Sequence, residues 1–159
     1  MATTVKLRAV IESDLPIFFA QQLDPEANRM AAFTSRDPAD HAAFLAHWAK
    51  IRADPSIVNQ TILADEQVAG SIASFVMFGE REIGYWLGRE YWGQGIATRG
   101  LALFVSQLPE RPLFARVAKD NLASLRVLQK CGFVIIGEDK GFAGARNAET
   151  EEFVLRLDD

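Results

Sequence analysis

The sequence predicts a single α+β domain over residues 1–159, built on a mixed, largely antiparallel central sheet with helices on both faces. Its 159 residues, 49% hydrophobic and 24% charged, suit one globular domain with a substantial core. Strand-like segments joined by short turns between Ile57 and Arg89 indicate an antiparallel meander. The strand, glycine-rich turn and helix of Glu82–Leu108 indicate a parallel crossover to the strand that follows.

The first third of the chain is predicted to form one strand followed by helices. In order, we expect a strand, a helix, a short helix or loop and a longer helix, over Val5–Val10, Leu15–Leu23, Pro25–Phe33 and Ala39–Arg52. Ser13 or Asp14 is the expected cap of the first helix. The apolar stripe of the longer helix is expected at Ala42, Leu45, Trp48 and Ala49.

The remaining elements are strands interrupted by two helices. The expected strands are Ile57–Ala64, Val68–Phe78, Glu82–Arg89, Leu113–Ala118, Phe133–Glu138 and Glu152–Leu157. The expected helices are Ile96–Leu108 and Asn121–Cys131. In the first of these helices Ile96, Leu103 and Phe104 should face the core, with Gly100 allowing close packing. Gly141–Ala148 is predicted to be a polar loop. If the last strand lies at an edge of the sheet, it could pair across a homodimer.

Charge and cysteine content argue against several classes of protein. The net charge of −4, without a basic stripe, argues against a nucleic-acid partner. Cys131 has no second cysteine to pair with, which suits a reducing compartment. His41 and His47 are too few for a zinc site. The chain shows neither a leader-like amino terminus nor an apolar run approaching about 18 residues, so we expect a cytoplasmic protein without a membrane partner.

The turn at Gly93–Gly95, between the central strand and its helix, has a composition that suits phosphate binding. The first turn of a helix leaves backbone N–H groups unpartnered at a partly positive end, and glycine lets a ligand approach the backbone. Gly93–Thr98 is therefore a candidate diphosphate cradle, although a tight turn without a ligand explains the same residues. A P-loop would need Lys and then Ser or Thr where Ile96 and Ala97 stand, and a dinucleotide fingerprint would need glycine at Thr98.

Two stretches of the chain resemble the GNAT superfamily of N-acetyltransferases. Trp92-Gly93-Gln94-Gly95-Ile96-Ala97 is similar to the acetyl-CoA-binding motif R/Q-x-x-G-x-G/A, with Trp92 in place of its first Arg or Gln. Asn121 to Phe133 is similar to the second signature, N-x-x-S/A followed by an apolar helix that ends in Gly-Phe. The Gly-Tyr-Trp-Leu strand before Trp92 is similar to the branch that contains the ribosomal-protein N-terminal acetyltransferases. The resemblance covers nearly the whole chain and implies a GNAT-like fold.

The resemblance also implies an activity, which is transfer of the acetyl group of acetyl-CoA directly to a primary amine. In this reading the chain is a transferase with acetyl-CoA as co-substrate, held where the strands Glu82–Arg89 and Leu113–Ala118 splay apart. The residues that the resemblance assigns to the cofactor are Trp86, Leu87, Gly88, Trp92, Gly93, Gln94, Gly95, Ile96, Ala97, Thr98, Asn121 and Ser124. Helix capping alone is the alternative role of Asn121.

The acid and the base of such a reaction need separate candidates. Many family members protonate the leaving thiolate with a tyrosine on the last helix, but counting from Asn121 this position is Leu128. Ser124 would face the same ligand and is the candidate proton relay. Glu82, at the start of the central strand, is the candidate base, with a plain surface charge as its alternative. Cys131, at a helix C-terminus, is expected to be a core residue and not a nucleophile.

The acceptor amine is expected to bind where the N-terminal helices meet the splayed strands. Phe33, Trp48, Phe75 and Tyr85 are the candidates to line that pocket, with plain core packing as their alternative. A protein N-terminus, a polyamine, an aminoglycoside and a small metabolite amine all stay open as acceptors. The alternative function is a non-catalytic acetyl-CoA-binding sensor or interaction module, which the missing tyrosine favours. Arg99 and Arg126 are expected on solvated helix faces, where either could meet cofactor phosphates.

Overall fold

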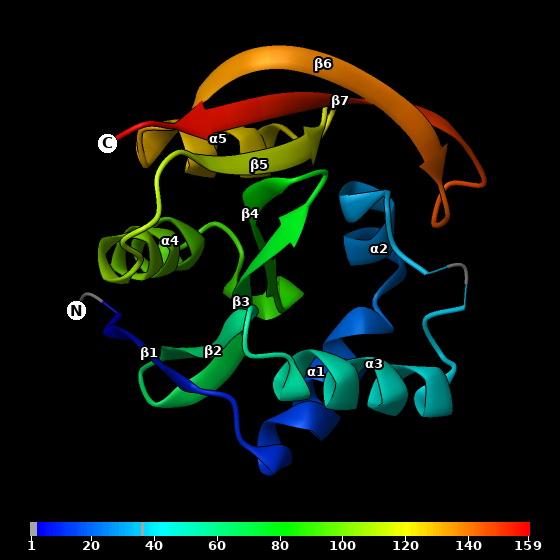
Figure 1. The fold of residues 1–159 in the computed structure, drawn as a ribbon. Helices are drawn as coiled ribbons and strands as arrows, with labels where there is room; N and C mark the ends of the chain where they lie inside the picture. The colour runs from blue at the N-terminus through cyan, green and yellow to red at the C-terminus, as the bar shows by residue number, and fades with distance from the viewer. Residues whose placement is uncertain (1–2, 36) are drawn as a thin grey trace.

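The computed structural model describes residues 3–35 and 37–159. Within these residues seven strands form one sheet in the order β1-β2-β3-β4-β5-β7-β6, in which only the neighbours β4 and β5 are parallel (Figure 1). The strands are β1 (Val5–Ala9), β2 (Val58–Ala64), β3 (Gln67–Met77), β4 (Glu80–Leu87), β5 (Leu113–Ala118), β6 (Val134–Ala143) and β7 (Ala148–Leu157). The α-helices are α1 (Leu15–Gln22), α2 (Pro25–Ala31), α3 (His41–Ala53), α4 (Ile96–Gln107) and α5 (Leu122–Lys130). The predicted fold class and the predicted antiparallel meander are confirmed.

Residues with positive φ close the two hairpins of the meander. Asp65 and Glu66 have φ of 49° and 69° between β2 and β3, and Phe78 and Gly79 have φ of 55° and 74° between β3 and β4. Two consecutive left-handed residues give the hairpin turn whose twist matches that of the paired strands. Asp65 also holds the start of β1, because its N–H donates to the carbonyl of Thr4 and its Oδ1 accepts from the N–H of Thr4, each at 2.8 Å.

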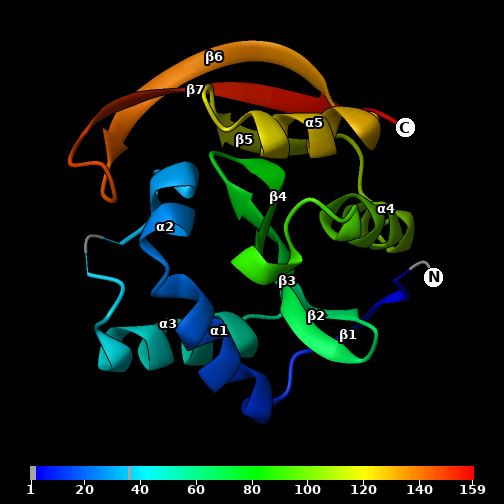
Figure 2. The same cartoon turned by 180° about the vertical axis from the view of Figure 1, so that it is seen from behind.

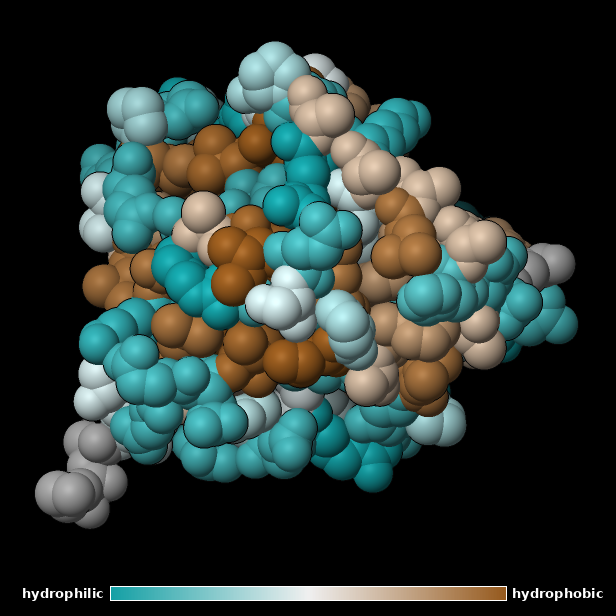
Figure 3. Space-filling view, turned by 90° about the horizontal axis from the view of Figure 1, so that it is seen from below, coloured by the Kyte–Doolittle hydropathy of each residue, from teal (hydrophilic) through white to brown (hydrophobic). Residues whose placement is uncertain are grey.

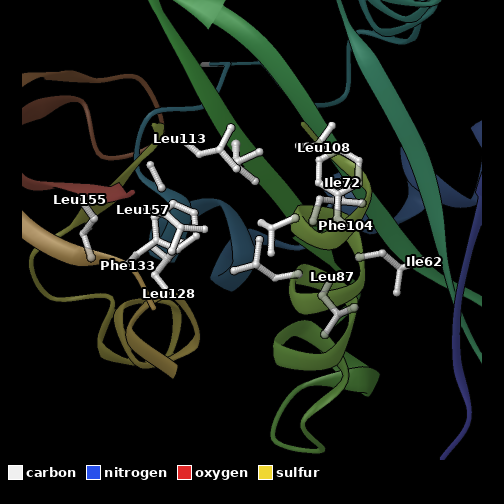
Figure 4. Packing of buried hydrophobic residues seen from close by; sticks show 14 of the residues in the cluster. Ile62, Ile72, Leu87, Phe104, Leu108, Leu113, Leu128, Phe133, Leu155 and Leu157 are labelled. Carbon is white, nitrogen blue, oxygen red and sulfur yellow. The ribbon is translucent and has the colours of Figure 1, made fainter. Parts of the chain in front are cut away.

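Helices cover both faces of the sheet, and the alternation of strand side chains explains how (Figures 1 and 2). Ile62 of β2 packs toward α4, in a core cluster that also contains Phe104 of α4 and Phe133 after α5 (Figure 4). The adjacent Thr61 points to the other face, where its hydroxyl contacts Asp14 just before α1. A smaller aromatic cluster on that face joins α1 to α3, with Phe18 stacked on Trp48 at 5.1 Å between ring centroids. The larger cluster on the α4 and α5 face is the main core.

Several predicted core positions are wrong, because α3 is less buried than its sequence suggests and α4 turns a different leucine toward the core. In α3 only Phe44 is buried, Trp48 is half-buried, and the rest of the predicted stripe (Ala42, Leu45 and Ala49) is exposed. Viewed from below, apolar and polar side chains are accordingly interspersed over the face that carries α1 and α3 (Figure 3). In α4, Leu103 is exposed and Leu101 is fully buried instead. A Cβ at Gly100 would meet Ile62 at an ordinary 3.5 Å, so close packing does not require glycine there.

The C-terminal hairpin differs most from the prediction. β6 continues from Val134 to Ala143 and β7 begins at Ala148, so half of the predicted loop Gly141–Ala148 is strand and only residues 144–147 are turn. Cross-strand pairing overrides the weak local preference of Gly141, which pairs with Thr150. β7 lies between β5 and β6, not at an edge, so the suggested dimer through this strand loses its basis.

None of the helices in the described parts of the chain has the length and apolar character that a membrane span requires.

Asp14 does not cap α1 as expected, because its carboxylate makes a buried ion pair. The side chain is 1% exposed and accepts from Nη1 and Nη2 of Arg8 at 2.7 and 2.8 Å, from Oγ1 of Thr61 at 2.7 Å and from the N–H of Ile11 at 3.0 Å. Burial alone would raise the pKa of Asp14, but these donors together outweigh it and lower the pKa to about 2. The ion pair thus joins β1, β2 and the start of α1.

We expect Asp14→Asn to lower the free energy of unfolding by about 2 kcal/mol at neutral pH. Since the pKa of Asp14 is depressed by folding, this stabilisation is present above the ordinary carboxyl pKa and is lost as the pH falls toward about 2. Urea unfolding of wild type and variant at pH 7 and near pH 3 measures both effects. Glu12→Gln, an exposed carboxylate two residues earlier, is the control and should change little. A constant difference across this pH range would contradict the assignment.

The one parallel junction of the sheet is nearly open. β4 and β5 share a single paired position, Glu82 with Phe114, whereas β5 pairs with β7 along its whole length. The two strands therefore diverge beyond Glu82, and the predicted gap between them is present.

Candidate active site

A cavity of about 500 Å³ fills the gap where β4 and β5 diverge. Its lining comes from both faces of the sheet, since it includes Phe33 after α2 on one side and Ser124 and Leu128 of α5 on the other. Glu82 and Trp86 of β4 project to the α2 side, while Tyr85 projects to the α5 side, because neighbouring strand residues alternate. The cavity therefore presents side chains from both faces of the sheet.

Glu82 is the buried carboxylate of this cavity. Its residue is 2% exposed, so the alternative of a surface charge at a strand end is wrong. Burial raises the pKa of Glu82, and the charge of Arg116 offsets only part of that rise. Oε2 of Glu82 lies 3.5 Å from Nε of Arg116, and neither atom has a hydrogen-bond partner among the described residues. A buried carboxylate with a raised pKa and an oxygen that accepts no hydrogen bond is suited to accept a proton.

Arg116 organises the acidic side of the cavity. Its Nη1 lies 2.9 Å from Oε1 of Glu152 and 3.0 Å from Oδ2 of Asp139, and its guanidinium carbon lies 4.6 Å from the ring centroid of Phe78. All five residues of this group, Glu82, Arg116, Asp139, Glu152 and Phe78, line the cavity. With three carboxylates around one guanidinium, the net charge of the group is negative when all are ionised, which favours a cationic ligand.

On the α5 side, Tyr85 and Ser124 form a hydrogen bond across the gap. The Tyr85 hydroxyl lies 2.6 Å from Oγ of Ser124, and both residues line the cavity. Burial raises the pKa of Tyr85 to about 12, so its hydroxyl stays protonated at neutral pH. The hydroxyl of Ser124 has no other hydrogen bond within the described residues. When Tyr85 donates, the proton of Ser124 is free to point at a ligand.

The glycine-rich turn before α4 has the form of an anion cradle. Gly93 and Gly95 adopt φ of 74° and 76°, and a Cβ at either position would meet nothing within 4 Å. No side chain caps α4, and its first backbone hydrogen bond runs from the N–H of Arg99 to the carbonyl of Gly95 at 3.1 Å. The N–H groups of Ile96, Ala97 and Thr98 are left to outside acceptors, as the first turn of an uncapped helix requires.

The last residues of β4 leave one backbone donor for the gap. The N–H of Gly88 donates to the carbonyl of Ala69 at 2.9 Å, and the Gly88 carbonyl accepts from Tyr91, so both its backbone groups are used. Strand alternation then sends the N–H of Trp86 toward β3 and that of Leu87 away from it. Trp92 fixes this end of the strand, because its Nε1 donates to the carbonyl of Leu87 at 2.9 Å. Of Trp86, Leu87 and Gly88, only Leu87 presents its N–H toward the gap.

Asn121 holds the start of α5 in place. Its side-chain oxygen accepts from the N–H of Ser124 at 3.3 Å, and its Nδ2 donates to the carbonyl of Met30 in α2 at 3.2 Å. These contacts support the capping role, and Asn121 also lines the cavity. Gly132 ends the helix with φ of 95°, as the sequence predicts.

The other candidates divide between the cavity and the rest of the fold. Phe33, Phe75 and Tyr85 line the cavity, whereas Trp48 packs on Phe18 away from it. The thiol of Cys131 donates to the carbonyl of Thr98 at 3.4 Å, and burial raises the pKa of that thiol, which fits a core residue. Arg99 donates to the carbonyl of Thr3 and so points toward β1, while Arg126 is exposed.

The sequence reasoning missed Arg116, Asp139 and Glu152 as parts of the site. An arginine inside an otherwise apolar, buried strand was a signal for Arg116, since such a charge needs carboxylate partners. No local signal identified Asp139 and Glu152. They come together only because β6 pairs with β7, in a register that places Asp139 opposite Glu152. Among the described residues no group of three or more His, Cys, Asp and Glu side chains could hold a metal ion.

A sheet that parts around a cavity, beside an uncapped glycine-rich helix start, defines an α+β protein that can hold a diphosphate-bearing cofactor against a second ligand. The family model of the acetyltransferase (GNAT) domain matches residues 4–134, and the chain belongs to this family. It is accordingly an acetyl-CoA-dependent acyltransferase, as the resemblance implies. A comparison with curated proteins found no match.

Solved structures of the same fold include proteins of the expected branch. RimJ of Mycobacterium smegmatis, in complex with CoA-disulfide, is 22% identical with a TM-score of 0.80 over 97% of this chain and 81% of that one. RimL, a ribosomal L7/L12 α-N-protein acetyltransferase, is 19% identical with a TM-score of 0.80 over 99% and 92%. The microcin C7 self-immunity acetyltransferase MccE, in complex with acetyl-CoA and AMP, is 15% identical with a TM-score of 0.78 over 98% and 92%. At these identities the similarity establishes the fold.

Proposed function

We propose that this protein transfers the acetyl group of acetyl-CoA to a primary amine that enters the cavity from the α2 side. The observation that carries the proposal is that a buried carboxylate, Glu82, and a tyrosine-bound hydroxyl, Ser124, line one cavity from opposite faces of the sheet. Amine acetylation needs a base on the amine side and a hydrogen-bond donor on the thiol side. The two groups supply these at the two ends of one gap.

The residues present fit acetyl-CoA. The free N–H groups at Ile96–Thr98 and the open space above Gly93 and Gly95 suit the diphosphate, and Trp92 and Gln94 hold the shape of that turn. Asn121 and Ser124 would lie along the pantetheine arm, and the N–H of Leu87 would donate to the thioester carbonyl. When bound, acetyl-CoA supplies the activated acetyl group.

Glu82 would accept the proton of the incoming ammonium, directly or through a water molecule. An amine attacks only in its neutral form, and ammonium groups are mostly protonated at pH 7. A carboxylate of raised pKa is a better match for this proton than an exposed one. Arg116 keeps the carboxylate in place through the 3.5 Å ion pair. The surrounding negative charge of Asp139 and Glu152 would favour entry of the ammonium form.

Ser124 would donate its hydroxyl proton as a hydrogen bond to the sulfur, with Tyr85 behind it. This pair would take the role of the tyrosine that many family members have at the position of Leu128. A thiol has an ordinary pKa of only about 8.5, so stabilising the leaving sulfur needs a donor more than a strong acid. Tyr85 stays protonated and fixes the direction of the Ser124 hydroxyl.

The proposal is tested by free-thiol release from acetyl-CoA with a mixed panel of amines, together with calorimetric binding of acetyl-CoA, CoA and ATP. We expect binding of acetyl-CoA and CoA but not ATP, and thiol release that depends on the amine. Binding without turnover on any amine would instead support the sensor. Absence of acetyl-CoA binding would contradict the assignment of Gly93–Thr98.

A further inference from the structure

The α2 side of the cavity has an apolar wall next to Glu82. Phe75 of β3 is the direct cross-strand partner of Glu82, and a Cβ at Gly84 would lie 3.4 Å from the Phe75 ring. The ring therefore covers β4 between Glu82 and Trp86, beside the position where the amine must lose its proton. Phe33, from the segment after α2, lines the same cavity.

The apolar wall continues outward to the surface. Met77 follows Phe75 on the same side of β3, and Phe78 covers Arg116 at the hairpin. Phe33, Met77 and Phe78 are 39%, 37% and 71% exposed. Single exposed apolar residues are common on protein surfaces, but a cluster of them is not. Here they gather at the mouth of a cavity whose inner end is acidic. An exposed apolar wall beside an acidic end fits a ligand that has an ammonium next to a large apolar group.

Two enclosed donors in the same cavity lining make no hydrogen bond within the described chain, although Nε of Arg116 has Oε2 of Glu82 at 3.5 Å as its ion-pair partner. Nε1 of Trp86 and Nε of Arg116 are buried and without a hydrogen-bond partner among the described residues. A buried donor that makes no hydrogen bond is unfavourable, so the Trp86 N–H in particular calls for a partner. Arg116 lies beside Glu82, which places a donor and the base within one ligand's reach. A carbonyl oxygen next to the amine would pair with such a donor.

We propose, on the basis of the function proposed above, that the acceptor is an α-amino acyl group with an aromatic or large aliphatic side chain. Its ammonium would lie at Glu82, its side chain against Phe75 and Phe33, and its carbonyl oxygen toward Arg116 or Trp86. The same chemistry occurs at the N-terminus of a peptide and in small aminoacyl compounds. Polyamines and aminoglycosides lack the apolar substituent and the adjacent carbonyl, and they do not fit this wall.

The test compares four acceptors with the full chain and saturating acetyl-CoA: phenylalaninamide, glycinamide, phenethylamine and spermidine. We expect kcat/KM for phenylalaninamide to exceed that for glycinamide by about 10- to 100-fold, from burial of the side chain. It should exceed that for phenethylamine, which lacks the carbonyl, by about 10-fold. Spermidine as the best acceptor, or equal rates with phenylalaninamide and glycinamide, would overturn the inference. No thiol release from any amine would instead defeat the proposed function itself.

Variants of the apolar wall test whether Phe75 and Phe33 cause the preference for phenylalaninamide over glycinamide. Phe75→Ala should lower the ratio of kcat/KM for phenylalaninamide to kcat/KM for glycinamide by about 10-fold, whatever its effect on the rate with glycinamide. Val76→Ala, an exposed neighbour on the opposite face of β3, is the matched control and should leave the ratio unchanged. Phe33→Ala tests the same wall from a different segment, should Phe75→Ala fail to fold. An unchanged ratio in both wall variants would overturn the assignment.

Trp86→Phe keeps an aromatic ring and removes the N–H donor. If the acceptor carbonyl reaches Trp86, the ratio of kcat/KM for phenylalaninamide to kcat/KM for phenethylamine should fall several-fold in this variant. If the ratio is unchanged, the carbonyl pairs with Arg116, and Arg116→Lys should lower it instead. An unchanged ratio in both donor variants would overturn the carbonyl part of the inference.

Discussion

Glu82→Gln is expected to lower kcat for amine acetylation by on the order of 10² to 10⁴, with little change in the affinity for acetyl-CoA. The substitution keeps the shape of the side chain and removes its ability to take a proton from the ammonium. Glu80→Gln is the matched control, because Glu80 lies on the same face of β4 and does not line the cavity. Steady-state thiol release at several amine concentrations measures the effect. Equal losses in the two variants would contradict the role of Glu82.

The pH dependence of the wild type gives a second check on Glu82. The carboxylate must be ionised to act as a base, and its pKa is raised above the ordinary 4.5 by burial. We therefore expect kcat/KM to rise with pH through a limb that lies above the ordinary glutamate range, and this limb should disappear in Glu82→Gln. A group whose pKa is raised by folding contributes stability at low pH that is lost as the pH rises through the folded-state pKa. At pH 7 the ionised Glu82 therefore costs the wild type stability, so Glu82→Gln should unfold at a temperature no lower than that of the wild type, which separates lost chemistry from lost structure.

Gly95→Ala is expected to weaken acetyl-CoA binding by about 10- to 100-fold. The new Cβ would stand in the open space above the turn, where the diphosphate must approach the N–H groups of α4. An alanine at φ of 76° also costs about 1 to 2 kcal/mol of stability. Gly79→Ala controls for that strain, because Gly79 has φ of 74° and equally open surroundings in the β3–β4 turn.

Calorimetry with acetyl-CoA, alongside thermal unfolding of both glycine variants, separates the two effects. Both variants should lose similar stability, and only Gly95→Ala should lose affinity. Wild-type affinity in Gly95→Ala would mean that the diphosphate lies elsewhere.

The sequence was most informative where local patterns and turn chemistry agree. The meander from β2 to β4 was predictable because alternating strand residues are followed by short polar turns. Helices α4 and α5 were predictable because a glycine marks the start of α4 and another the end of α5. The extent of β6 was not predictable, since Gly141 and its neighbours favour a loop and become strand only through pairing with β7. In α3 a stripe of alanines resembles a buried face although the tertiary structure covers only Phe44 and Trp48.

The candidate site also has one part that the sequence could predict and one part that it could not. The candidate cofactor residues Gly93–Thr98 and Asn121 belong to contiguous motifs, so they could be proposed directly from the sequence. The environment of Glu82 could not, because its burial depends on Arg116 of β5 and on Glu152 of β7, both distant in sequence. The Tyr85–Ser124 contact likewise joins β4 to α5 across the gap. The candidate catalytic groups are thus brought together by tertiary contacts, whereas the candidate cofactor cradle is formed by local backbone geometry.

The single paired position between β4 and β5 has a consequence for cooperativity. The sheet consists of two ladders, β1 to β4 and β5 with β7 and β6, that are joined in register at only one point. A ligand bound between the two ladders would form hydrogen bonds to both of them. The ligand-bound protein should therefore unfold more cooperatively than the free protein. Ligand at 100 times its Kd would add about 2.7 kcal/mol by mass action. The slowed amide exchange should be concentrated along the facing edges of β4 and β5, where free protein leaves backbone groups open to solvent exchange.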